Sequence, residues 1–163
     1  MKIRLILALL LLLPGFIVQA QSSQQKIDKA AFYTVMNSGD LEAVDNEIAV
    51  VIASISAEKD GYLGALLMRK AGLVKRPADK LRFFKAGRLK FDPAIAADKD
   101  NLEFHFLRFA IQEHAPKIVK YKADLQNDKS AIINGYKNAP IAVKSAIADY
   151  AKKSKLLKPS DLN

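Results

Sequence analysis

The chain of 163 residues contains no cysteine. It can therefore form no disulfide bond, and it has no cysteine that could carry the lipid of a lipoprotein. Its stability must come from a packed hydrophobic core. Half of its residues are hydrophobic, which excludes general disorder and is compatible with one ordinary domain.

Residue patterns typical of catalytic sites are also missing. No serine lies in a Gly-x-Ser-x-Gly turn, no glycine-rich phosphate loop is present, and Thr34 is the only threonine. The only two histidines, His105 and His114, are nine positions apart on one predicted helix, so they face opposite sides and cannot share a metal ion from that helix. We therefore expect a non-catalytic protein without metal or cofactor, in which both histidines are structural.

The first residues have the three-part layout of a secretory signal. Lys2 and Arg4 precede an unbroken apolar run over residues 5–13, and a Pro-Gly pair follows. Small or modest side chains stand where signal peptidase requires them, which places the cleavage between Ala20 and Gln21.

An uncleaved membrane anchor is the alternative reading of this leader. Its apolar segment, residues 5–18, is shorter than the roughly 20 residues of a membrane-spanning helix. We therefore expect residues 1–20 to be a signal peptide and residues 21–25 a mobile start of the mature chain. The protein would then be periplasmic or extracellular, without an integral membrane segment.

Hydrophobic periodicity predicts helices along the rest of the chain. Residues 47–55 are rich in β-branched side chains and could also form a buried strand, but the periodic segment is too long for a usual strand. Gly64 would let a neighbouring backbone approach closely. The predicted helices cover residues 27–36, 41–56, 60–74, 78–91, 101–114, 125–136 and 140–150. Apolar residues expected to face inward include Ala31, Leu41, Val51, Ile52, Ile55, Leu63, Leu66, Leu81, Phe84, Leu89, Phe91, Phe106 and Ile147.

Capping residues and prolines set the expected helix ends. Asp40 is a good N-cap, and Asp100 with Glu103 resembles a capping box before the fifth helix. Pro77 suits a first helical turn, whereas Pro93 should end or kink the fourth helix near Phe91, and residues 94–97 could add one more turn. These signals predict an all-α fold of about seven helices stacked as antiparallel hairpins. The domain would span residues 26–155, followed by a polar tail, residues 156–163, that frays.

The segment FDPAIAADKDNLEFHFL, residues 91–107, resembles the junction between two tetratricopeptide units. Phe91 and Ala94 match packing positions of a second helix, and Asp98 and Asn101 match the turn. A Leu-Gly pair at residues 63–64 is similar to the pair on a first helix of that family. The chain departs from the family pattern by having Lys99 at the usual proline position, and by a longer spacing between these motifs. The resemblance implies a binding or scaffolding role without catalysis.

The positive charge of the chain is concentrated after residue 60. The net charge is +9, with −4 over residues 21–60 and +11 over residues 61–163. Residues 69–90 alone hold nine basic residues and one acid. This stretch can be the solvated face of a scaffold or an anion-binding surface. The candidate anion-binding residues are Arg69, Lys70, Lys75, Arg76, Lys80 and Arg88.

Two functions are compatible with these observations. The first is an exported interaction module that binds a protein or peptide against a helical groove. The alternative is a cell-envelope binder of anionic lipid or polysaccharide that uses the basic region 69–90. Export argues against nucleic acid as a partner.

Overall fold

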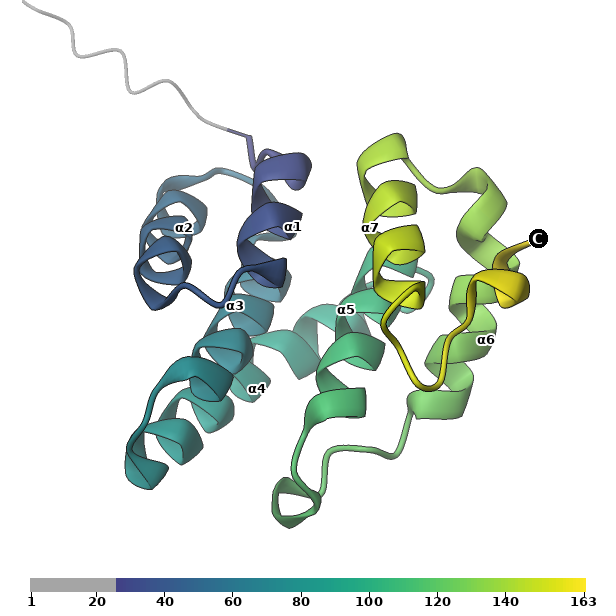
Figure 1. Ribbon diagram of the computed structural model, residues 1–163. Coiled ribbons are helices and arrows are strands. Elements are labelled where there is room, and N and C mark those ends of the chain that lie inside the picture. The colour runs from purple at the N-terminus through teal and green to yellow at the C-terminus, as the bar shows by residue number, and fades with distance from the viewer. Residues whose placement is uncertain (1–25) are drawn as a thin grey trace, which may run out of the picture.

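The computed structural model describes residues 26–163, which form seven α-helices and three short 3₁₀-helices and contain no strand (Figure 1). The α-helices are α1 (Lys29–Asn37), α2 (Leu41–Ala53), α3 (Lys59–Leu73), α4 (Pro77–Ala97), α5 (Leu102–His114), α6 (Leu125–Gly135) and α7 (Ile141–Ala151). The 3₁₀-helices are η1 (Lys117–Val119), η2 (Tyr136–Asn138) and η3 (Pro159–Leu162). The prediction of an all-α fold is confirmed. The predicted signal peptide, its cleavage position and the predicted mobile segment 21–25 lie outside the described residues.

None of the helices within residues 26–163 combines the length and the apolarity that crossing a membrane requires.

The predicted N-caps are partly correct. Asp40 caps α2 by accepting a hydrogen bond from a first-turn N–H at 2.9 Å. The cap of α5 is Asn101, whose side chain accepts from the Phe104 N–H at 3.1 Å, so the prediction of Asp100 is wrong by one residue. No capping box forms with Glu103, because that side chain turns inward and accepts hydrogen bonds from α1.

Helices α3 and α4 lie side by side and form the most extensive helix contact in the described part of the chain (Figure 1). Two glycines face each other at this contact. A Cβ atom on Gly64 would lie 2.8 Å from the Gly87 carbonyl oxygen and 2.7 Å from the Phe91 Cβ, well inside van der Waals distance. The prediction that Gly64 permits a close backbone approach is confirmed.

Helix α4 continues past Pro93 to Ala97, so Pro93 does not end the helix, and the additional turn over residues 94–97 that the sequence left open is formed. Proline removes the N–H that would bond to the carbonyl four residues earlier, which belongs to Leu89. The Leu89 side chain is 77% exposed, so this carbonyl lies on the side of the helix where water can replace the missing donor.

Several apolar residues that were expected to face inward are exposed. In α1 the buried side chains are Phe32 and Tyr33, and in α2 only Val44, Glu47 and Val51 are buried. For the residues of α2, the reason is that this helix packs mainly on α3 and α1, which cover one narrow face of α2 and leave its other apolar residues uncovered. The exposed residues are Ala31, Leu41, Ile52, Ile55, Leu81 and Leu89.

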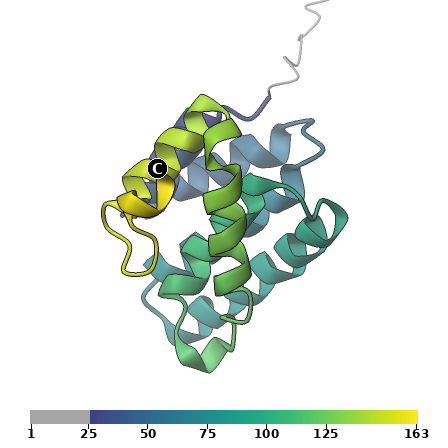
Figure 2. The same ribbon diagram turned by 90° about the vertical axis from the view of Figure 1, so that its right-hand side faces the viewer.

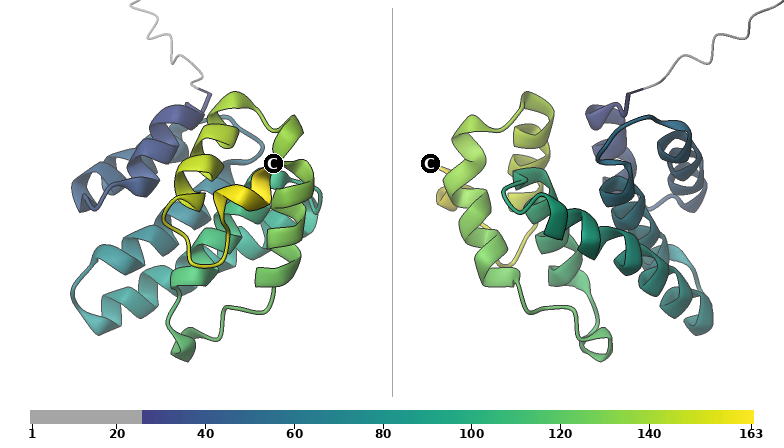
Figure 3. Two further views of the ribbon diagram at one scale, coloured as in Figure 1. Left: turned by 45° about the vertical axis from the view of Figure 1, so that its right-hand side comes forward. Right: turned by 180° about the vertical axis from the view of Figure 1, so that it is seen from behind.

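Helix α5 is central in the fold. Seen from behind, it lies between a group formed by α1–α4 and a group formed by α6 and α7 (Figure 3). Its buried Glu103 accepts hydrogen bonds from the Tyr33 hydroxyl at 2.7 Å and from the Lys29 Nζ at 2.5 Å. These bonds fix the start of α5 against α1.

The C-terminal tail does not fray. Leu157 is fully buried and Leu162 nearly so, and η3 lies beside α6 and α7 (Figure 2). The carboxylate of Glu113, at the end of α5, accepts hydrogen bonds from the Ser154 hydroxyl at 2.6 Å and from the Lys155 N–H at 2.7 Å. Lys129 of α6 also donates to the Leu156 carbonyl oxygen at 2.7 Å and pairs with Asp161 at 2.8 Å, so buried leucines and polar contacts together hold the tail.

Candidate ligand-binding groove

A groove with a cavity volume of about 1030 Å³ lies between the two groups of helices. Helices α1 and α3 and the first half of α4 form one wall, α5 forms the floor, and η1 and the end of α7 form the other wall. Most of the lining is apolar. The apolar lining residues include Met36, Met68, Leu81, Phe84, Ile111 and Ile118.

The groove exists because α4 and α5 carry more apolar side chains than their helix neighbours cover. Leu107, Ala110 and Ile111 are spaced three and four residues apart and therefore share one face of α5. On α4 the same spacing places Leu81 beside Phe84. Leu81 is 48% exposed because it faces the groove and not another helix.

The neutral polar side chains of the lining are largely engaged within the protein. The Tyr33 hydroxyl donates to Glu103, and burial together with that carboxylate raises the pKa of Tyr33 far above its usual value. The hydroxyls of Tyr150 and Ser154 both donate to Glu113, each at 2.6 Å. Since the walls are helical, most backbone groups are also paired. The groove therefore offers apolar surface and few neutral hydrogen-bonding groups.

The charged side chains of the lining all have one sign. Arg69, Lys80, Lys85 and Lys153 line the groove, and none of the described aspartates or glutamates does. Within residues 26–163 the three lysines form no ion pair, and all three are exposed. The mouth of the groove is therefore positively charged.

Arg69 differs from the lysines because it is partly buried. Its Nη2 donates to the carbonyl oxygen of Ser38, which holds the α1–α2 turn against α3. Its Nε is buried without a hydrogen-bond partner in the described structure. Burial lowers the pKa of Arg69, and no carboxylate of residues 26–163 forms an ion pair with it.

The structure divides the six candidate anion-binding residues. Arg69 and Lys80 line the groove. Lys70 forms an ion pair with Asp45 of α2, and Arg88 forms one with Asp92 at 2.9 Å. Two others lie at the α3–α4 turn: Lys75, which is exposed, and Arg76, whose Nε is 3.8 Å from an Asp79 carboxylate oxygen.

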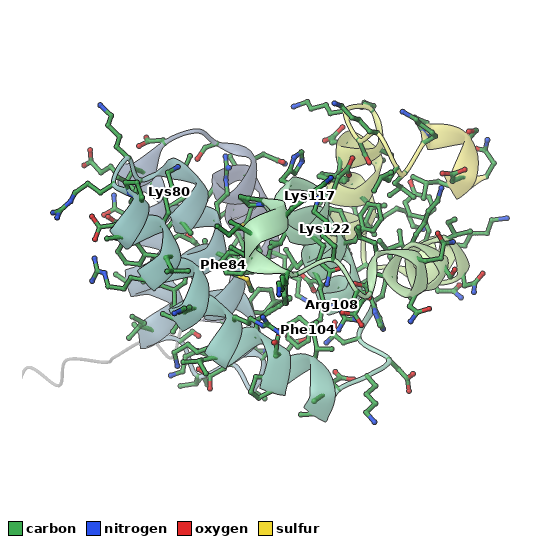
Figure 4. The ribbon with its side chains drawn as sticks, turned by 90° about the horizontal axis from the view of Figure 1, so that it is seen from below. Lys80, Phe84, Phe104, Arg108, Lys117 and Lys122 are labelled. Atoms are coloured by element: carbon green, nitrogen blue, oxygen red, sulfur yellow. The ribbon has the colours of Figure 1, made fainter. Side chains whose placement is uncertain are left out.

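The two histidines have separate environments. His105 Nδ1 lies 2.6 Å from the fully buried Asp128 carboxylate, which also accepts two hydrogen bonds from Arg108 at 2.6 and 2.7 Å. This cluster joins α5 to α6 (Arg108 is labelled in Figure 4). His114 lies at the rim of the groove. Residues 26–163 contain no group of three or more histidine, aspartate or glutamate side chains placed to hold a metal ion.

Sequence reasoning expected a helical groove but did not say which residues line it, and Lys85 and Lys153 were not among its six candidate cations. The excess of apolar residues on the predicted fourth and fifth helices was the available signal. Which of these residues remain uncovered depends on where α1, η1 and α7 pack, and no local pattern contains that information.

Comparison of the chain with protein-family models, curated proteins and solved structures found no match. The tetratricopeptide resemblance accordingly stays a prediction.

Proposed function

We propose that this protein is an exported, non-catalytic binding module that takes up a helical segment of a protein or peptide partner in the groove. The observation that carries the proposal is the apolar groove of about 1030 Å³ between α1, α3 and α4 on one side and η1 and α7 on the other, with α5 as its floor. A binding role is also what the tetratricopeptide resemblance implies, and the predicted leader of residues 1–20 supports export.

The chemistry of the lining favours a helix as the occupant. An extended peptide would bring unpaired backbone groups to a surface that offers few partners for them, and leaving such groups buried is costly. A helix satisfies its own backbone and can insert one apolar face, which is a common mode of peptide recognition. The volume of the groove, about 1030 Å³, is close to the volume of roughly nine residues of a helix that is about 10 Å in diameter.

The same groove carries the alternative function, binding of an anionic lipid. An acyl chain also has no polar groups to satisfy, and Arg69, Lys80 and Lys85 of the basic region lie at the apolar surface. A polysaccharide fits less well, because its many hydroxyl groups would find few free polar partners in the groove.

The function is tested with a neutral helical peptide and two matched variants. The peptide is acetylated and amidated, about 15 residues long, with leucine at positions i, i+3, i+4 and i+7 and glutamine on its other face. Leu81→Ser changes an exposed leucine in the groove, and Leu89→Ser changes an exposed leucine of the same helix outside it.

Fluorescence anisotropy then gives the affinity of the peptide for each protein. We expect the wild type to bind the peptide and Leu89→Ser to bind it equally well. Complete burial of a leucine side chain contributes about 1.5–3 kcal/mol. Leu81 is only 48% exposed before binding, so Leu81→Ser should lose affinity by roughly tenfold. The proposal fails if no binding is detected up to about 1 mM peptide, or if both variants lose affinity equally.

A further inference from the structure

We infer that the segment bound in the groove is acidic: an amphipathic helix whose apolar face is flanked by glutamate or aspartate side chains. This inference rests on the proposed function and names the chemistry of the partner. It is based on the distribution of cations on α4 and around the groove.

Cations on α4 fall into two classes. Outside the groove, Arg82, Arg88 and Lys90 each lie within 3.0 Å of a carboxylate of the same protein. At the groove, Lys80 and Lys85 have no such partner in the described structure, although they belong to the same helix. On α4, acids therefore accompany the cations that lie outside the groove, and none of the described aspartates or glutamates belongs to the groove lining.

The unpaired cations come from both walls. Lys80 and Lys85 lie on the α4 wall, and Lys153 follows α7 on the opposite wall. Figure 4 shows Lys80 and Phe84 on α4, with Lys117 on the η1 segment that faces them; Lys117 itself lies outside the groove lining. A helix with its apolar face toward α5 would therefore meet positive charge along both of its edges.

Arg69 adds a more buried donor at the α3 wall. Its guanidinium is partly desolvated, and its Nε lacks an acceptor. A carboxylate of the bound helix would give this cation the counter-ion that the protein itself does not supply. The lysines would set the charge preference, and Arg69 would favour a carboxylate at one end of the groove.

The inference is tested by exchanging only the polar face of the neutral peptide. Glutamate replaces glutamine in an acidic version and lysine replaces it in a basic version, and affinities are measured by anisotropy from low to high salt. Each exposed ion pair contributes up to about fivefold, so we expect the acidic peptide to bind roughly tenfold more tightly than the neutral one at low ionic strength. The advantage should vanish toward 1 M salt, where the Debye length falls to about 3 Å.

Matched charge-reversal variants separate the groove from net charge. One variant changes Lys80, Lys85 and Lys153 to glutamate. The control changes Lys26, Lys99 and Lys137 to glutamate; these are exposed lysines outside the groove lining, and the change in net charge is the same. The groove variant should prefer the basic peptide, while the control keeps the acidic preference.

The outcomes distinguish the two proposals. If the three peptides bind equally and Leu81→Ser weakens all of them, the function stands and the acidic preference is wrong. If no peptide binds, the function itself is wrong. Binding of oleate in the groove without binding of any peptide would assign the site to an anionic lipid. Salt-sensitive self-association that blocks the groove, measured by sedimentation, would assign it to the acidic, partly apolar α2 face of a second copy. Either result overturns the inference.

Discussion

Replacing Gly64 by alanine tests the close approach of α3 and α4, on which one wall of the groove depends. The added Cβ would lie 2.7 Å from the Phe91 Cβ and 2.8 Å from the Gly87 carbonyl oxygen. Both neighbours belong to or directly join the backbone of α4, so no side-chain rotation can relieve the contact. The helices must move apart, and overpacking of this kind costs about 1–3 kcal/mol.

Gly72→Ala is the matched control because it makes the same change in the same helix. A Cβ at Gly72 meets no atom within 4 Å. Both substitutions gain helix propensity of up to about 1 kcal/mol, so the difference between the two variants approximates the cost of the contact. We therefore expect Gly72→Ala to be slightly more stable than the wild type and Gly64→Ala to be about 1–3 kcal/mol less stable than Gly72→Ala.

Urea unfolding followed by circular dichroism at 222 nm measures this difference. With a slope of about 2 kcal/mol per molar urea, the midpoints of the two variants should differ by roughly 0.5–1.5 M. Equal midpoints, or a higher midpoint for Gly64→Ala, would contradict the described contact between α3 and α4.

Three further predictions concern carboxylates and the C-terminal tail. Burial would raise the pKa of Glu113, but hydrogen bonds from Ser154, Tyr150 and the Lys155 N–H outweigh burial and lower it. The ionised Glu113 carboxylate therefore stabilises the folded protein above pH 4.5, and this contribution is lost as the pH falls further. Glu113→Gln should therefore lower the free energy of unfolding by about 1–3 kcal/mol at pH 7. The difference in melting temperature between wild type and variant should become smaller below pH 4.5, and a difference that does not depend on pH would refute this assignment. Burial raises the pKa of Glu47, so the free energy of unfolding falls as the pH rises above 4.5 and this side chain ionises. Glu47→Gln should therefore raise the melting temperature at pH 7 but not at pH 4. An unchanged melting temperature at pH 7 would contradict the prediction. Leu157→Ala should lose about 2–5 kcal/mol in urea unfolding because the side chain is fully buried, whereas a frayed tail would give no loss.

Sequence reasoning located the helices well because each has its own local signal. Periodic apolar residues, the Asp40 cap and Pro77 at a first turn act within a few residues of one another, so no tertiary information is needed. The same reasoning did not decide between a helix end and a continued helix at Pro93, because a missing N–H is tolerated where water can reach the unpaired carbonyl. It also failed for Ile52 and Ile55, because periodicity shows that a helix has an apolar face but not how much of that face a neighbour will cover.

The site was less accessible to sequence reasoning than the fold. Arg69 and Lys80 were chosen from a basic stretch, and both line the groove. Asp92, four residues after Arg88, was a local sign that Arg88 forms an ion pair on its own helix. No local sign separates Lys70, because its partner Asp45 lies on another helix. Lys153 is more than 60 residues away from Arg69 and Lys80 in the chain, and it reaches the same groove only through the packing of α7. A convergent site of this kind is specified by tertiary structure.

The two methionines of residues 26–163, Met36 and Met68, both line the groove, which makes their methyl groups direct reporters of its occupancy. The deciding measurement is a methyl NMR titration of protein labelled with ¹³C at the methionine methyl groups, using the acidic peptide. Both methyl signals should shift and saturate together, with the affinity found by anisotropy. Saturated peptide binding that leaves both signals in place would show that the partner binds elsewhere and would contradict the account.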